Sequence, residues 1–192
     1  IASDPDRFFD TALVGYNFKS SPAIKEAIAR AAQAGIGIIA MKTQAGGYTT
    51  DALGPISPHQ AALKWALQDT NVACAIPGMK NMDQLREDIA VMGMKLTLAD
   101  KQILKRYSEA ISPYYCHLCA QCEPTCPKHV AISVINRSLL YAEAYGSLEL
   151  GRTTYNEINV NESASACTGC SECTARCVNG LDIAEKMRKA QA

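Results

Sequence analysis

The stretch Cys116-His-Leu-Cys119-Ala-Gln-Cys122-Glu-Pro-Thr-Cys126-Pro127 decides how the second half of this chain folds, because it compresses four cysteines into one short loop. The same spacing returns at Cys167-Thr-Gly-Cys170-Ser-Glu-Cys173-Thr-Ala-Arg-Cys177. Both runs follow C-x2-C-x2-C-x3-C, in which three neighbouring thiolates bind one cubane and the fourth reaches the other cluster. The duplicated spacing therefore predicts two [4Fe-4S] clusters.

Exchange of the fourth cysteine between the runs defines two ligand sets. The first, here called the Cys116 set, comprises Cys116, Cys119, Cys122 and Cys177. The second, the Cys167 set, comprises Cys167, Cys170, Cys173 and Cys126. Pro127 follows its run as the motif expects, whereas Val178 stands where the second run would have proline. Because this proline is not a ligand, its absence weakens the second motif only slightly.

Zinc and disulfide bonds are the alternatives for these eight cysteines. Structural zinc usually takes pairs of ligands separated by a longer spacer. A disulfide framework belongs in an oxidising, extracellular context and does not require an internal duplication. We read the ninth cysteine, Cys74, as a buried small hydrophobic residue, because it lies in an apolar run. His59 and His129 are read as ordinary helix and loop residues. His117 lies between two ligands and is read as a solvated loop residue, with tuning of a cluster through a hydrogen bond as the alternative.

The first half of the chain alternates short apolar runs with amphipathic segments, which predicts β-α-β-α-β-α with a parallel sheet. The predicted strands are residues 12–18, 36–41 and 72–76. Capping residues and proline or glycine at the ends predict helices at about residues 22–34, 57–68, 81–92 and 97–110. A three-stranded fragment would leave sheet edges open, so we expect further sequence upstream.

After Pro113 no strand pattern appears, and the domain boundary is expected near residues 110–114. Apolar residues at helical spacing predict a helix over about residues 131–145, between the two cysteine runs. The forty residues that separate the runs resemble the linker of α-helical ferredoxin domains found in several redox enzymes. We therefore expect residues 1–111 to form an α/β domain and residues 112–192 a mainly helical, ferredoxin-like domain.

Charge and hydropathy exclude some partners. The 19 Lys and Arg residues equal the 19 Asp and Glu residues, so no net field attracts nucleic acid. No stretch approaches the roughly 20 apolar residues that span a bilayer. Clusters favour the reducing cytoplasm, and export of a protein folded before transport is the alternative.

Three segments of the first half resemble the last three βα units of an aldo-keto reductase. They are Gly15-Tyr-Asn-Phe18, residues 34–42 with Gly46-Gly47, and Ala75-Ile-Pro-Gly-Met-Lys80 followed by Gln84-Leu-Arg-Glu-Asp88. Joined to the cysteine runs, the chain looks like the iron-sulfur branch of that family. The resemblance implies the C-terminal part of a (β/α)8 TIM barrel, NADP(H) as cofactor and a small carbonyl or alcohol as substrate.

By the same resemblance, the nucleotide-contacting positions are Gly78, Lys80, Gln84 and Asp88, with Lys80 placed to pair with a 2′-phosphate. Departures from the family accompany them: Met41 stands where an aromatic residue often stacks on the nicotinamide, and Asp88 replaces an Asn. The alternative interpretation is that Lys80 is a solvated loop lysine and Gly78 a simple turn.

No residue of this sequence matches the family's Asp, Tyr, Lys and His tetrad, so we assign no catalytic residue. Two hypotheses follow. The chain is part of an iron-sulfur oxidoreductase that couples a barrel active site to electron transfer, or it is an electron-transfer module whose barrel portion is a scaffold or docking surface. Both hypotheses require a redox partner protein, and neither identifies it.

Overall fold

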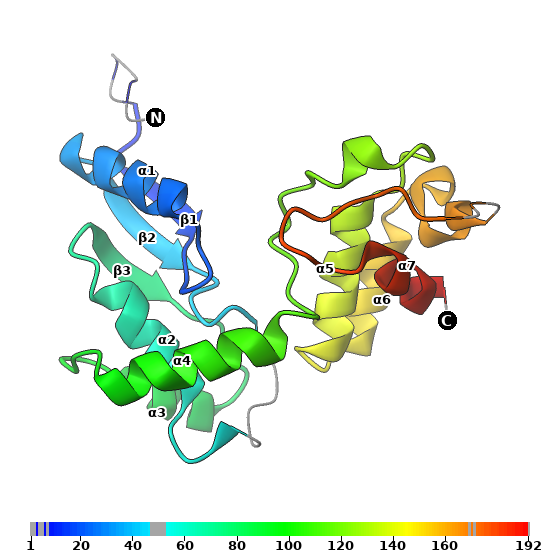
Figure 1. Cartoon of the computed structure of the whole chain (residues 1–192). Helices are drawn as coiled ribbons and strands as arrows, with labels where there is room; N and C mark the ends of the chain where they lie inside the picture. The colour runs from blue at the N-terminus through cyan, green and yellow to red at the C-terminus, as the bar shows by residue number, and fades with distance from the viewer. Residues whose placement is uncertain are drawn as a thin grey trace. The chain divides into compact units, whose positions relative to one another are not determined.

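Three parallel strands in the order β1-β2-β3 form the sheet of the N-terminal half (Figure 1). In this computed structural model they comprise β1 (Thr11–Gly15), β2 (Gly37–Met41) and β3 (Val72–Ile76). Helix α1 (Pro22–Gln33) connects the first pair, and α2 (Pro58–Leu67) connects the second. The β-α-β-α-β order predicted from the sequence is confirmed, and it is consistent with a part of a TIM barrel.

The structure describes residues 3, 6, 8–46, 53–168, 170 and 172–191. They separate into two compact units that divide near residue 110. Two more helices, α3 (Met82–Ile89) and α4 (Leu98–Ile111), follow β3. We call the sheet-containing part unit 1 and the part from Ala110 onward unit 2. Part of the predicted loop at residues 46–47 lies outside the described residues.

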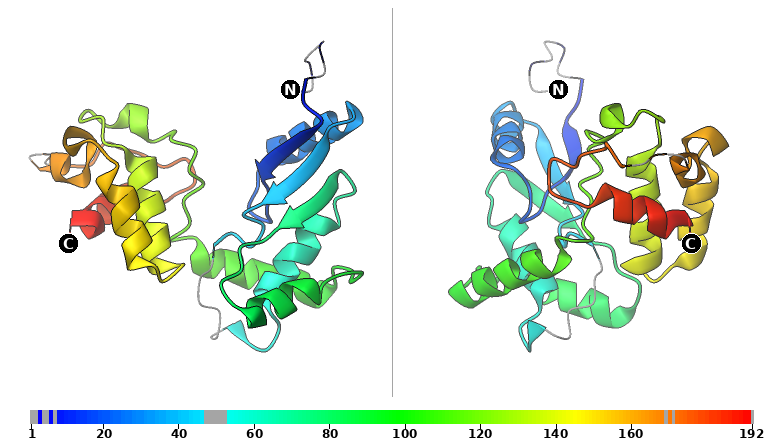
Figure 2. Two further views of the ribbon diagram at one scale, coloured as in Figure 1. Left: turned by 180° about the vertical axis from the view of Figure 1, so that it is seen from behind. Right: turned by 45° about the vertical axis from the view of Figure 1, so that its right-hand side comes forward.

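The sheet of unit 1 has one face packed against helices. Ile38 and Ala40 of β2 are buried there, together with Ile28 of α1 and Ala66 of α2. Figure 2 shows the three strands side by side. Burying aliphatic groups such as Ile38 contributes about 1.5–3 kcal/mol each, which makes this face the main stabilising contact of the sheet.

The opposite face of the sheet is apolar but exposed, and here the interpretation of Cys74 is wrong. Cys74 is exposed, because the register between β2 and β3 shifts by one residue after Ile38. The shift pairs Cys74 with Ile39, which is itself paired with Leu13. All three therefore lie on the face away from α1 and α2, and Leu13 is 55% exposed.

Most element boundaries fall close to those predicted. Strand β1 ends at Gly15 rather than at residue 18, because the Asn17 side chain accepts a hydrogen bond from the Lys19 amide at 2.9 Å. This Asx-type turn redirects the chain. Helix α3 ends at Ile89, three residues before its predicted end, and a turn with Gly93 at a φ of 75° follows.

Unit 2 consists of helices and loops. Helix α5 (Ile132–Glu143) lies where the sequence predicted a helix, and α6 (Leu148–Asn156) and α7 (Ile183–Gln191) were not individually predicted. Helices α5 and α6 pack closely, since a Cβ atom at Gly151 of α6 would stand 2.9 Å from the carbonyl oxygen of Ser138. Among the described residues, seven α-helices accompany the single small sheet.

The two cysteine runs lead into similar structure. His129 and Gly180, each three residues after the last cysteine of its run, both have positive φ, at 53° and 78°. Three residues further, α5 begins at Ile132 and α7 at Ile183, and both isoleucines are buried in one core. The duplication in sequence is therefore also a duplication in backbone structure.

Within the described part of the chain, no helix has the length and apolar character that crossing a membrane requires.

Candidate functional site

The cysteines of both runs surround the hydrophobic core of unit 2. Cys122 is buried in that core with Val130, Leu181 and Met187. Five further cysteines pack against the same core while partly exposed: Cys116, Cys126, Cys167, Cys173 and Cys177. Cys119 and Cys170 are exposed. Six of the eight thiols therefore lie in or against an apolar interior, where water has limited access.

One cavity collects the four thiols of the Cys167 set. Its volume is about 250 Å³, and Cys126, Cys167, Cys170 and Cys173 all line it. Met187, Ala175 and Ala184 form apolar wall, and the exposed side chains of Lys128, Glu172 and Arg188 stand around it. Cys126 thus lies with the second run in space, although it belongs to the first in sequence.

Hydrogen bonds hold the ends of the two runs together. The Thr174 hydroxyl donates to the carbonyl oxygen of Thr125 at 3.0 Å, and the Arg176 amide donates to the Thr125 hydroxyl at 3.2 Å. Thr125 directly precedes Cys126, while Thr174 and Arg176 lie between Cys173 and Cys177. This bridge holds Cys126 close to the second run, and no local sequence pattern indicated it.

The thiols that raise one another's pKa belong to the same predicted ligand set. Burial raises the pKa of Cys116, and the neighbouring thiols of Cys177 and Cys119 raise it further. Burial also raises the pKa of Cys122 to about 11, with added contributions from Cys116 and Cys177. The pKa of Cys167 is raised by burial and then by Cys126, Cys173 and Cys170. The raised pKa values favour the protonated thiol over the thiolate.

The backbone around the first run directs an amide group toward a cysteine sulfur. Leu118 and Ala120, on either side of Cys119, both have a φ of 57°, in the left-handed region. The Leu118 amide donates to the sulfur of Cys116 at 3.4 Å. In the same way, the Asn179 amide donates to the sulfur of Cys177 at 3.4 Å. Turns that aim successive N–H groups inward form concavities typical of anion and Fe–S sites.

Among the described residues, there is no group of three or more His, Cys, Asp or Glu side chains that could hold a metal ion. A zinc ion draws four thiolates to within about 2.3 Å of one point. A cubane instead takes its four thiolates on four separate irons. A ring of thiols around a cavity fits the larger group better than the single ion.

The predicted nucleotide positions lie at the end of β3 and on α3. Gly78 and Lys80 are exposed, and a Cβ atom at Gly78 would meet no atom within 4 Å. The Gln84 side chain accepts a hydrogen bond from the Lys80 amide at 2.7 Å. Asn81 caps α3 by accepting from the Gln84 amide at 2.9 Å. These contacts shape the loop between β3 and α3 without any ligand.

Asp88 has a different environment from the other three positions. It is 8% exposed, and its carboxylate accepts a hydrogen bond from the Gln44 side chain at 2.7 Å. Burial raises its pKa above the usual aspartate value, although the bond from Gln44 opposes the shift. Asp88 therefore joins α3 to the loop after β2, and its negative charge is turned into the protein.

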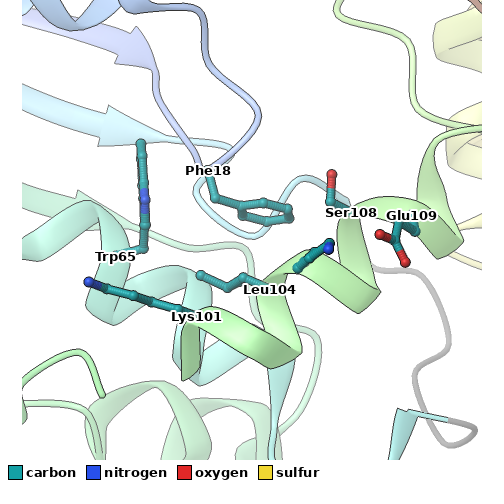
Figure 3. A pocket seen from close by; sticks show the side chains of 7 residues that line it. Phe18, Trp65, Lys101, Leu104, Ser108 and Glu109 are labelled. Carbon is teal, nitrogen blue, oxygen red and sulfur yellow. The ribbon is translucent and has the colours of Figure 1, made fainter. Parts of the chain in front are cut away.

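A separate groove of about 380 Å³ lies in unit 1 along α4 (Figure 3). The rings of Phe18 and Trp65 and the side chain of Leu104 supply its apolar surface, as Figure 3 shows. Lys101 and Glu109 of α4 are among its polar residues. None of the predicted nucleotide positions or cysteines lines this groove.

An α/β unit with parallel strands, followed by a helical unit with cysteines around its core, is the arrangement that defines this chain. Residues 52–109 match the model of the Aldo/keto reductase family. The matched segment contains β3, α3, most of α4 and all four predicted nucleotide positions, and it associates unit 1 with a family of oxidoreductases. The match ends before the cysteine runs. No curated protein and no solved structure gives a match to the chain.

Proposed function

We propose that this chain is part of an iron-sulfur oxidoreductase of the aldo-keto reductase type. In this proposal, unit 2 holds two [4Fe-4S] clusters through the Cys116 and Cys167 sets, and unit 1 contributes the end of a barrel that binds NADP(H). The observation that carries the proposal is that Cys126 lines one cavity with Cys167, Cys170 and Cys173. Spacing alone implies this exchange, and the cavity supports it independently.

The chain's own residues have four tasks at these sites. Eight thiolates supply the ligands, and the bridge through Thr125 keeps the two sets adjacent. The amides of Leu118 and Asn179 stabilise negative charge on the sulfurs they contact. Apolar residues such as Met187 limit the access of water. Clusters bound there would pass single electrons between a partner and the barrel site.

NADP(H) binding rests on the match of residues 52–109 and on the loop that follows β3. Lys80 is exposed, and it carries the positive charge that recognition of an anionic group requires. Gly78 leaves open space beside the backbone, as close approach by a ligand requires. The N-terminus of α3 adds a favourable dipole for phosphate.

The second candidate function is an electron-transfer module in which unit 1 only docks or scaffolds. Two contacts favour it. Asp88 is buried against Gln44, and the Gln84 side chain is already bonded to the Lys80 amide. Both positions thus have structural roles that need no nucleotide.

The cluster proposal is tested by purifying the chain without oxygen and measuring iron, acid-labile sulfide and zinc. About eight irons and eight sulfides per chain are expected, with an EPR spectrum of two interacting reduced clusters after dithionite treatment. Zinc in place of iron, or iron without sulfide, contradicts the proposal.

Titration with NADPH separates the two candidate functions. If unit 1 is an active barrel, the full-length protein binds NADPH, and NADPH reduces the clusters without an added reductase. Lys80→Ala should then weaken binding, while Lys95→Ala, which removes an exposed lysine outside the β3–α3 loop, serves as control. Reduction by a separate electron donor with no NADPH binding favours the module instead.

A further inference from the structure

Lys186 is a buried cation in unit 2, where cysteine thiols pack against the core. It is 6% exposed and lies on α7, nine residues after Cys177. Its ammonium stands 5.1 Å from the ring centre of Tyr114, two residues before Cys116. Lysines are almost never buried to this degree unless a partner holds them.

The carboxylate that pairs with Lys186 is shared with a second lysine. Glu143 of α5 stands 3.5 Å from the Lys186 ammonium, but it also stands 2.6 Å from the ammonium of Lys189. Two cations share this carboxylate, and Lys186 makes the longer of the two contacts. Lys186 lies on the helix that follows Cys177, and its ring partner Tyr114 lies two residues before Cys116, so both sides of this contact belong to segments that supply the Cys116 set.

The duplication offers an internal comparison. The residue nine positions after Cys126, the last cysteine of the first run, is Ile135, which is fully buried. Thus the two runs are followed by helices that differ at this position, one with a cation and the other with an aliphatic side chain. The amides of Leu118 and Asn179 also both donate hydrogen bonds to sulfurs of the Cys116 set.

The Cys167 set has charged neighbours of its own, but they are exposed. Lys128 and Arg188 line its cavity together with Glu172, which carries the opposite charge. Water and salt screen exposed charges strongly, whereas a buried charge acts through a medium of lower dielectric constant. The charge of Lys186 is therefore screened less than the charges of these exposed groups.

We propose that Lys186 is a positioning charge that makes the Cys116 set the site of higher reduction potential, so that the first electron entering the chain resides there. The inference rests on the proposed function, because it needs a cluster at each set. Adding an electron adds negative charge to a cluster, and a nearby cation favours that state. The inference also sets a direction for the relay, from the Cys167 set toward the Cys116 set.

The experiment uses the full chain with its clusters and measures midpoint potentials by EPR-monitored redox titration. To assign the potentials, variants with both Cys126 and Cys167 changed to Ala keep only the Cys116 set, and variants with both Cys116 and Cys122 changed to Ala keep only the Cys167 set. In the first background Lys186→Met should shift the potential to a more negative value. In the second background the same substitution should leave it unchanged.

Three further variants test whether the shift in potential comes from the charge of Lys186. Lys186→Arg retains the charge and should restore a potential near that of the unsubstituted protein. Lys189→Met removes a half-exposed cation from the same helix and should produce a smaller shift. Glu143→Gln should shift the potential of the Cys116 set in the opposite, more positive direction, which gives a result even if Lys186→Met loses iron.

The possible failures are distinguishable. Fewer than two clusters in the unsubstituted chain would refute the proposed function. Two intact clusters whose potentials do not respond to Lys186→Met or Glu143→Gln, or respond equally at both sets, would overturn this inference and leave the proposed function standing.

Discussion

At the scale of the residue, the fourth cysteine of each run separates two possible arrangements of ligands. Either each run supplies its fourth cysteine to the cluster of the other run, or each run binds a cluster of its own. Cys126 lines a cavity with three cysteines more than forty positions away, and its nearest ligands in sequence lie elsewhere. Two double variants can therefore show which cysteines bind the same cluster.

We predict that changing both Cys126 and Cys167 to Ala leaves about four irons per chain, because both residues belong to one set. Changing both Cys122 and Cys126 to Ala should remove nearly all iron, because the two residues belong to different sets. The measurement is iron per chain after anaerobic purification. The reverse result, with iron retained only in the second variant, would show that each run binds its own cluster.

A second residue-scale feature is the buried pair of Tyr16 and Asp69. The Tyr16 hydroxyl donates to the Asp69 carboxylate at 2.7 Å, and Asp69 is 9% exposed. Burial by itself raises the pKa of Asp69, but the hydrogen bonds from Tyr16 and Asn71 outweigh burial and hold that pKa below its ordinary value. The stability from this pair is therefore present above the unfolded aspartate pKa of about 4 and is lost as pH falls through the lower folded value.

Tyr16→Phe should lower the free energy of unfolding of unit 1 by about 1.5–3 kcal/mol at neutral pH, with a smaller loss near pH 3. Urea unfolding can be followed through Trp65, the single tryptophan of the chain, whose ring centre lies 5.0 Å from that of Tyr16. Tyr107→Phe, which removes a donor to the carbonyl oxygen of Gln44, is the matched control with a neutral acceptor. A loss for Tyr16→Phe that does not change with pH would contradict the assigned charge state of Asp69.

At the scale of the element, local signals predicted the helices of unit 1 better than the contacts their side chains make. Ser57 caps α2 as expected, accepting from the Gln60 amide at 3.1 Å. The Gln60 side chain does not complete the capping box, because it donates to the carbonyl oxygen of Glu87 at 2.8 Å instead. Ser21 precedes α1 with the same residue type, yet its side chain makes no capping hydrogen bond.

These two serines form a natural pair of variants. Ser57→Ala should lower the free energy of unfolding by about 1 kcal/mol, because it removes a cap and also the hydroxyl bonded to Glu87. Ser21→Ala should cost clearly less. Urea unfolding monitored by Trp65 fluorescence measures both, and equal losses would mean that the capping contact at Ser57 contributes nothing beyond sequence propensity.

Helix α6 and its packing on α5 show what the sequence could not reveal. The signal for its start was present in Ser147, which accepts from the Leu150 amide at 3.4 Å, and Asp182 gives α7 a similar start. A capping residue followed by so short an apolar pattern also occurs in loops, so these helices were not separately predicted. The close approach at Gly151 depends on tertiary packing, which no local pattern encodes.

We predict that Gly151→Ala destabilises unit 2, although alanine favours helix formation by about 1 kcal/mol over glycine. The new Cβ atom would stand 2.9 Å from the Ser138 carbonyl oxygen and 3.2 Å from the Ala142 Cβ atom, so the helices must separate. Overpacking of this kind costs about 1–3 kcal/mol. Thermal unfolding followed by far-UV circular dichroism should show a lower midpoint for Gly151→Ala than for Arg152→Ala, an exposed site on the same helix. A higher midpoint would mean that α5 and α6 are not in contact at this glycine.

At the scale of the whole molecule, the two units are stabilised by different means. Different features of the sequence therefore predicted their cores. Unit 1 has an aliphatic and aromatic core, which hydrophobic periodicity predicts well, while the exposure of Cys74 depended on a register shift that periodicity does not contain. Unit 2 builds its core around cysteines, so its ligand positions could be read from spacing. The contribution of Lys186 could not, since it arises where α7 packs near Tyr114.

This contrast predicts that removing iron affects the two units differently. The core of unit 2 contains one buried cysteine and five partly buried ones, and the pKa values of Cys116, Cys122 and Cys167 are raised mainly by burial. Without metal, the cavity of about 250 Å³ has no filling group, and binding free energy that would support folding is lost.

Chelation of iron under anaerobic conditions should therefore reduce the helical circular dichroism signal, while Trp65 fluorescence and its urea midpoint change little. Trp65 packs against Tyr16 in unit 1, so it reports on that unit alone. The matched control is a chain in which all eight motif cysteines are changed to Ser, which should resemble the chelated protein before any chelator is added. An unchanged helical signal after complete iron loss would show that unit 2 folds without metal, and a large change at Trp65 would show that the stability of unit 1 depends on the clusters.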